Sequence, residues 1–459
     1  MSTETAVVEK KVKISDLKKR GLVGAFEALE EEVEENPTEI TEETASIPEE
    51  LEEGAEELDE ENEEVSEIAE AINEGEEDVA VLDRISDVMT DSIEAGEGLD
   101  ENAAKIAEVA IESIYSRLGM SKRKVIPAME SFGNKTTRLS ATRMALEELE
   151  EGKKTIGESL KGWIKEVSQR TVETIKKAYI LIRSYEGLAK KYKSLAGSME
   201  DGEVSQIKSS SVAEAFGFLG SITGDTIAKQ LQEQGDKSTK LIVNLVDAYK
   251  KSNEAVGGIF NDKNPPKVEA ILKVIHSAQN AAIKSVGKHE GKAVVVGPFI
   301  GGKQLVIDLA GEGEEAKYDS SWVDVEGKKE SPEEFAALSK ADIIKVCDAV
   351  LGIFAKSKEA EDKWNWASQD FESTDNLVYK GLQKIKDIPW YKESEGEINK
   401  ASNALGCVQK QLIDATGQVF NNNSKAMQNA LLLCSLSLKK AGKPAEAPST
   451  SESTEEPAA

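Results

Sequence analysis

The sequence predicts a mainly α protein in which long amphipathic helices form an elongated bundle with a small β hairpin or meander inserted. Three observations lead to this prediction. Apolar residues recur at intervals of three and four over much of residues 103–438. Short β-branched runs interrupt this pattern between residues 291 and 328. The two ends of the chain have the composition of disordered segments.

The first 130 residues carry almost all of the negative charge. They contain 39 acidic and 12 basic residues, a net charge of −27, which leaves 47 acidic and 45 basic residues, or −2, for residues 131–459. Residues 27–78 have no aromatic side chain and few β-branched ones, so they can bury too little apolar surface to offset chain entropy. We therefore expect an acidic, largely disordered region over residues 1–130.

Two short helices are expected within this acidic region. Residues 22–29 follow a locally basic stretch over residues 5–20 and form either a weak helix on a flexible tail or a docking peptide. A clearer helix is expected near residues 103–118, before Gly119. Its predicted apolar stripe consists of Ile106, Val109, Ala110, Ile114 and Leu118.

The strongest helical signal lies between residues 136 and 196. We expect one helix over residues 139–149 and a longer one after Gly152. The apolar stripe of the longer helix comprises Ile156, Leu160, Trp163, Ile164, Val167, Ile175, Ala178, Ile182, Tyr185, Tyr192 and Leu195. Its opposite face is basic, with Lys161, Lys165, Arg170, Lys176, Lys177, Arg183, Lys190, Lys191 and Lys193. That face is either solvated or a contact surface for phosphate groups or an acidic protein.

The remaining elements follow the same pattern. Further helices are predicted over residues 212–231, 238–251, 270–286, 332–355 and 395–438. Strands are predicted over residues 293–296, 304–309 and 321–325. Ser331 is the expected N-cap of the fourth of these helices, since Glu334 follows three residues later.

These elements divide the chain into five expected regions. They are an acidic, largely disordered propeptide over residues 1–130, a helical domain over 131–290, a small β element over 291–328, a second helical domain over 329–440 and a disordered tail over 441–459. The three cysteines form no CxxC pair, so neither a disulfide framework nor a zinc site is expected. The sequence has neither a secretory signal nor a membrane-spanning run, which predicts a protein without membrane contact.

The motifs offer little for catalysis or cofactor binding. Residues 297–304 nearly match a phosphate-binding loop, but Gln304 replaces the Ser or Thr that would hold magnesium, and a strand follows instead of a helix. A glycine-rich hairpin turn is the favoured interpretation. The two histidines, His276 and His289, have no metal-ligand spacing. We expect a protein that is not an enzyme and uses no cofactor or metal; a zymogen with an unrecognised hydrolase or nucleotidase site is a weaker alternative.

Three segments resemble a known family. They are residues 110–119 (AIESIYSRLG), residues 127–132 (PAMESF) and residues 138–147 (RLSATRMALE), followed by the helix that contains Trp163. They resemble the internal head (prohead core) proteins of giant tailed bacteriophages, which are made with an acidic propeptide. The resemblance implies a structural protein inside the capsid of the virion, assembled in the host cytoplasm and trimmed by the phage prohead protease.

The resemblance also implies a cleavage site. Ala128 would be the small recognition residue, Met129 the unconstrained one, and the bond between Glu130 and Ser131 the one cut. Similar triplets end at Glu27, Glu94, Glu112 and Glu200. Glu130 differs from these because it lies at the charge boundary and precedes a Ser-Phe pair.

The implied partners are the prohead protease, other capsid or core proteins, and packaged DNA through the basic helix face after trimming. The main alternative is a non-enzymatic acidic interaction protein, which would mimic DNA or bind basic partners.

Overall fold

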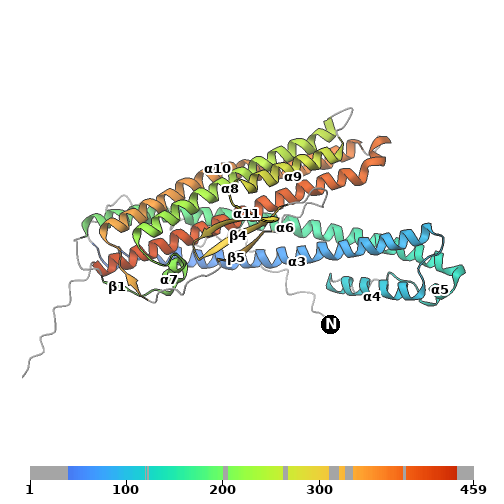
Figure 1. Cartoon of the computed structure of the whole chain (residues 1–459), viewed down its shortest axis with the longest axis horizontal. Coiled ribbons are helices and arrows are strands. Elements are labelled where there is room, and N and C mark those ends of the chain that lie inside the picture. The colour runs from blue at the N-terminus through green and yellow to red at the C-terminus, as the bar shows by residue number, and fades with distance from the viewer. Residues whose placement is uncertain are drawn as a thin grey trace, which may run out of the picture. The chain divides into compact units, whose positions relative to one another are not determined.

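Long α-helices with two small antiparallel sheets make up the protein (Figure 1). This computed structural model describes residues 40–118, 120, 124–199, 205–261, 267–309, 320–325, 334–385 and 389–441. The predicted mainly α fold class with an inserted β element is confirmed. The expected helix over residues 22–29 and the expected tail beyond residue 441 lie outside the described residues.

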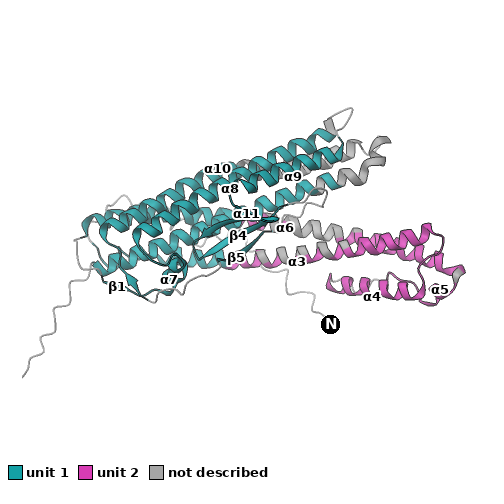
Figure 2. Ribbon diagram, in the orientation of Figure 1, with its two compact units in different colours: residues 1–59, 174–459 teal, residues 60–173 magenta. Residues whose placement is uncertain are grey.

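The chain divides into two compact units (Figure 2). Unit 1 combines residues 1–59 with residues 174–459, and unit 2 is the continuous stretch 60–173. One boundary falls within helix α3 (Glu49–Glu94) and the other within helix α6 (Lys135–Ser198). The expected division after residue 130 concerns processing and remains a prediction.

We call residues 1–130 the acidic segment. Where the structure describes it, from residue 40 on, most of it is helical, although its composition led us to expect mostly disorder. Helix α3 begins at Glu49, and its buried leucines and methionine recur at intervals of seven residues: Leu51 and Leu58, then Leu82 and Met89. Asp78 and Ser86 of α3 are buried as well, so the buried positions form a narrow stripe along the helix, and many of the exposed positions are acidic. Average composition therefore conceals the stripe.

Helix α4 (Glu101–Arg117) forms where the sequence predicts a helix, but it buries a different face. Its N-cap is Asp100, whose carboxylate accepts a hydrogen bond from the amide of Ala103 at 2.8 Å. The buried residues are Ala104, Ala107, Ile111, Ile114 and Tyr115. Ile106 and Val109 are 72% and 67% exposed, so their assignment to the buried stripe is wrong. Two alanines take their place, because small side chains allow the helix to approach its neighbours closely.

Helix α6 is continuous, although we expected a break at Gly152. That glycine is buried, and the hydroxyl of Tyr115 occupies the place where a Cβ would be. Gly152 is therefore a contact point between α4 and α6 and does not end a helix. The predicted stripe residues Ile156, Ile175, Ala178, Ile182, Tyr185, Tyr192 and Leu195 are buried. The side chains of Leu160, Trp163, Ile164 and Val167 lie outside the described part of the chain.

Unit 1 contains the remaining helices. They are α7 (Ser210–Phe216), the short 3₁₀ helix η1 (Gly217–Leu219), α8 (Gly224–Asn261), α9 (Val268–Lys284), α10 (Lys340–Ile385) and α11 (Pro389–Ala441). Helix α8 packs against α9, α10 and α11, and α11 also contacts α7, α9 and α10. Part of α6 joins this packing, since Tyr179 lies edge-on to Phe420 of α11 with ring centroids 6.2 Å apart.

The β element is an antiparallel meander, as expected. Its order is β2 (Lys288–Glu290), β3 (Ala293–Phe299), β4 (Lys303–Asp308) and β5 (Ser320–Asp324). Val294, Val296, Leu305 and Ile307 form its buried side, and Phe299 lies edge-on to Trp322 at 5.1 Å. A second sheet, which the sequence did not suggest, pairs β1 (Gln206–Ile207) with β6 (Phe335–Ala336).

Helix α10 starts later than expected. Ser339 is the capping residue, because its hydroxyl accepts a hydrogen bond from the amide of Asp342 at 3.2 Å. The proposed cap at Ser331 with Glu334 is therefore wrong: Glu334 precedes β6 and forms an ion pair with Lys208 at 2.5 Å. Ser331 and Ser339 are each followed by an acidic residue three positions later, and the pairing of β6 with β1 leaves the helix to begin after Ser339.

Candidate proteolytic processing site

The four residues of the implied cleavage site lie in a short segment between α4 and α6. Ala128 and Glu130 are exposed, whereas Met129 and Ser131 are half-buried. A single-turn helix, α5 (Glu130–Gly133), begins at the glutamate. The amide of Ser131 donates to the carbonyl of Ala128, and the amide of Phe132 to that of Met129, both at 2.9 Å. The side chains of Ala128, the small recognition residue, and of Glu130, after which the cut would fall, are therefore both accessible.

Buried residues flank this accessible segment on both sides. Ile126 is 2% exposed and Phe132 is fully buried. Arg138 donates from Nε to the carbonyl of Phe132 at 3.1 Å, and the hydroxyl of Thr137 donates to the carbonyl of Ser131 at 2.8 Å. Proteolysis of folded chain proceeds through a locally opened state. Cutting after Glu130 therefore requires local opening of α5, which includes the buried Phe132.

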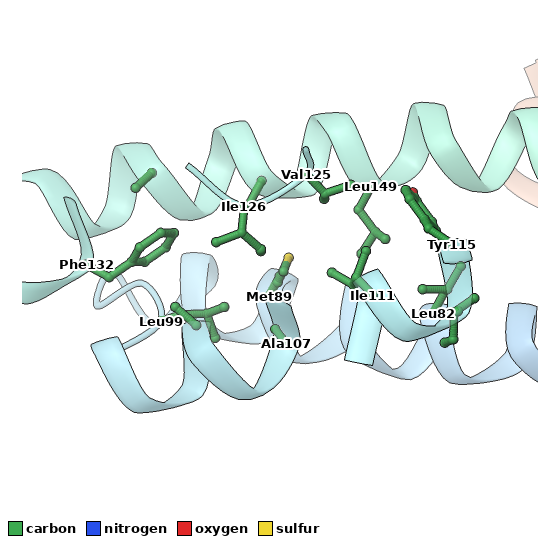
Figure 3. Close-up of a cluster of buried hydrophobic side chains, with 14 of the residues drawn as sticks. Leu82, Met89, Leu99, Ala107, Ile111, Tyr115, Val125, Ile126, Phe132 and Leu149 are labelled. Carbon is green, nitrogen blue, oxygen red and sulfur yellow. The ribbon is translucent and has the colours of Figure 1, made fainter. Parts of the chain in front are cut away.

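Residues from both sides of the implied cut form one hydrophobic core (Figure 3). Residues before the cut contribute Leu82, Met89, Leu99, Ala104, Ala107, Ile111, Ile114, Tyr115, Val125 and Ile126. Residues after it contribute Phe132, Ala141, Ala145, Leu149 and Ile156. Their side chains fill the space between α6 and the pair α3 and α4. We call this set the unit 2 core.

The loop between α3 and α4 is bound to the start of α6. The amide of Leu99 donates to the hydroxyl of Thr142 at 2.9 Å, and that hydroxyl donates to the carbonyl of Arg138 at 2.9 Å. The preceding Gly98 has φ +68°, and a Cβ there would lie 2.8 Å from the amide nitrogen of Leu139. Arg138, Leu139 and Thr142 of the family-like segment 138–147 thus lie against the loop between α3 and α4.

Charged groups add a second link between α3 and α6. Lys153 lies 2.6 Å from Asp83 and 2.8 Å from Glu150, which accepts a hydrogen bond from Ser86 at 2.5 Å. Burial is the largest single influence on Glu150 and opposes its ionisation, but the hydrogen bonds from Lys153 and Ser86 and the positive charge of Lys153 together outweigh it and lower the pKa of Glu150. Arg117 of α4 pairs with Asp78 of α3, and this raises the pKa of the arginine.

Comparison with known families shows which family the chain belongs to. The family of phiKZ-like phage internal head proteins matches residues 27–436, which include α3, α4, the segment around Glu130 and nearly all of unit 1. The chain belongs to this family. It is accordingly a structural protein of the phage head interior and not an enzyme. No curated protein and no solved structure matches the chain.

The other cleavage-like triplets of this internal head protein lie in different surroundings. The triplet that ends at Glu112 lies inside α4, and its middle residue, Ile111, is 1% exposed in the unit 2 core. The triplet that ends at Glu94 lies at the last residues of α3. Glu27 and Glu200 lie outside the described residues. Among the described triplets, the one at Glu112 is therefore the least suited to cleavage.

The basic face of α6 is partly engaged by carboxylates of the same internal head protein. Arg170 lies 3.4 Å from Glu64 of α3 and 3.1 Å from Glu166, Lys190 lies 2.7 Å from Glu186, and Lys193 lies 2.6 Å from Asp348. Lys176 and Arg183 are exposed. The side chains of Lys161 and Lys165 are outside the described set. Glu64 belongs to the acidic segment, so this segment covers part of the basic face.

The glycine-rich loop over residues 297–302 serves the fold of the internal head protein. Three side chains of α8 bind its backbone: Gln230 donates to the carbonyl of Pro298 at 2.7 Å, Lys237 donates to that of Gly297 at 3.0 Å, and Gln234 accepts from the amide of Ile300 at 2.9 Å. The residues that follow form β4 and not a helix. The hairpin-turn interpretation is confirmed, and the loop attaches the meander to α8.

His276 is also accounted for by packing. It lies half-buried on α9, and burial lowers its pKa. Within the described residues, no three His, Cys, Asp or Glu side chains form a group that could hold a metal ion. Nor does any described helix have the length and apolar character needed to cross a membrane.

Proposed function

We propose that this internal head protein is made as a precursor and is cut between Glu130 and Ser131 by the prohead protease during head maturation. The accessibility of Ala128 and Glu130 carries the proposal, because both recognition side chains are exposed in a segment that joins two helices. The triplet at Glu112, in contrast, would require α4 to unfold and Ile111 to leave the unit 2 core.

The charge boundary near residue 130 also supports a cut after Glu130. A cut after Glu130 separates residues with a net charge of −27 from residues with a net charge of −2. Packaged DNA repels such a negative segment over about one Debye length, roughly 8–10 Å at physiological salt. Because DNA fills the head, removing the acidic segment lowers this repulsion.

Removal of the acidic segment also changes the basic face of α6. Arg170 loses its contact with Glu64 when the acidic segment leaves, and Lys176 and Arg183 are already exposed. We propose that this face then contacts the phosphates of packaged DNA, beside other head proteins as partners. Binding of this kind weakens as salt rises, because phosphate contacts release condensed counterions.

Intact mass spectrometry of the protein isolated from mature particles tests the proposed cut. We expect a fragment whose N-terminal residue is Ser131. A chain in mature particles that still begins at Met1 or Ser2 would contradict the proposal.

A matched pair of variants tests the position. Glu130→Gln removes the charge on which recognition depends and should leave the chain uncut in particles. Glu112→Gln changes the corresponding residue of the α4 triplet, which is exposed in the folded protein, and should be cut like the natural sequence. If Glu112→Gln prevented the cut and Glu130→Gln were cut normally, the cleavage site would lie after Glu112 in α4 and the proposal would be wrong.

A further inference from the structure

We infer that the cut after Glu130 does not by itself release the acidic segment, which stays bound to the rest of the protein until a separate event removes it. This inference rests on the proposed cleavage position. Its test uses an engineered cut, so it can fail or succeed whether or not the prohead protease uses Glu130.

The peptide bond that is cut lies outside the unit 2 core, and its amide makes one local hydrogen bond, to the carbonyl of Ala128. Hydrolysis adds one water molecule across the peptide bond and yields a carboxylate on Glu130 and an ammonium group on Ser131. Glu130 is exposed and Ser131 is half-buried, so neither new charge belongs to a fully buried residue. Of the fifteen residues of the unit 2 core, none is the residue immediately before or after the cut.

The unit 2 core needs both fragments. Ten of its residues precede the cut and five follow it. Separation would expose large apolar side chains on both fragments, among them Ile111 and Met89 on one and Leu149 and Phe132 on the other. Exposure of apolar area to water opposes dissociation. The buried hydrogen bond between Leu99 and Thr142 would also be lost.

The acidic segment is also held by a second set of contacts, in unit 1, in addition to the unit 2 core. Ala45 and Leu51 are fully buried and Leu58 is 1% exposed, all before the cut. Asp59 pairs with Lys425 of α11 at 2.9 Å. The acidic segment therefore takes part in the packing of each unit separately. A single cut after Glu130 leaves both sets of contacts in place.

A full-length protein with a site-specific protease sequence inserted between Glu130 and Ser131 tests the inference. After complete cutting, we expect both fragments to elute together in gel filtration under native conditions and to separate in denaturant. They should remain together in about 1 M sodium chloride, where the Debye length is about 3 Å and ion pairs are screened. Separate elution directly after cutting would overturn the inference. Release by salt alone would overturn the apolar core as its cause.

Variants of the cut protein test whether the unit 2 core keeps the acidic fragment bound. Leu149→Ala removes a fully buried side chain that follows the cut, and it should speed release of the acidic fragment at least several-fold. Ile111→Val is a milder change in the same core, for use if the first variant does not fold. Ile106→Ala alters a side chain on α4 that is 72% exposed and should release the fragment at the natural rate. Equal release rates in all three would contradict the inference.

Discussion

The amide of Leu99 donates a hydrogen bond to the buried hydroxyl of Thr142 at 2.9 Å. This bond joins the loop between α3 and α4 to the first turns of α6, across the proposed cleavage position. The same hydroxyl donates to the carbonyl of Arg138 at 2.9 Å, so both its donor and an acceptor lone pair are used. Thr142 of the family-like segment thus stabilises unit 2 by linking two parts of its backbone.

Replacing this hydroxyl should weaken unit 2. Thr142→Val keeps the shape of the side chain but leaves the Leu99 amide without its acceptor, which costs about 1–3 kcal/mol for a buried group. We expect faster amide exchange over residues 82–126 in hydrogen-exchange mass spectrometry. The exposed Ser140 on the same helix turn supplies the control, and Ser140→Ala should leave the exchange pattern as it is.

The contact between Gly152 and Tyr115 predicts an unusual response to alanine. Inside a helix, Gly→Ala normally stabilises by about 1 kcal/mol. At position 152 the new Cβ would overlap the Tyr115 hydroxyl, so we expect Gly152→Ala to lower the melting temperature of unit 2. Adding Tyr115→Phe should restore part of the loss. Gly197→Ala, at a position of α6 with open space around it, should be neutral or stabilising.

The ion-pair link between α3 and α6 predicts acid sensitivity. The folded-state pKa of Glu150 lies below its ordinary value of 4.5, so its contribution to stability is present above that value and is lost as the pH falls through the lower folded-state pKa. Unit 2 should therefore lose stability below about pH 4.5, measured by its melting temperature against pH. In Glu150→Gln this contribution is absent, and the acid limb of the curve should be shallower.

The burial of Phe132 predicts how fast the cut occurs. Phe132→Ala removes the side chain that holds α5 in the unit 2 core, at a cost of about 3–5 kcal/mol in stability. The segment around Glu130 then opens more often, and trimming by the prohead protease should be faster than in the natural sequence. Slower trimming of this variant would show that the protease reads Phe132 itself.

Periodicity predicted the helices and the meander because it depends on local pattern alone. Periodicity gave the wrong answer where the sequence allows two arrangements and contacts with neighbouring helices decide between them. In α4 the large apolar residues Ile106 and Val109 suggested one face, yet the helix buries Ala104 and Ala107, since close approach favours small side chains. At Gly152 the pattern suggested a helix end, and only the position of Tyr115 explains why the glycine lies inside α6.

The cleavage position was predicted from a resemblance and the charge boundary, and the accessible Ala128 and Glu130 are compatible with it. What the sequence could not supply was the attachment of the acidic segment. Buried positions such as Leu51 and Leu58 lie seven residues apart among glutamates, and the neighbouring Asp59 pairs with Lys425, far along the chain. Composition averages over such a stripe, so it suggests disorder where a helix forms.

The continuity of unit 2 has a consequence for synthesis on the ribosome. Residues 60–173 are contiguous, so this unit has its whole core as soon as that stretch has emerged. Unit 1 must wait for α11, because Asp59 pairs with Lys425 near the other end of the chain. Contacts between distant residues form slowly. We therefore expect unit 2 to fold before unit 1 during synthesis.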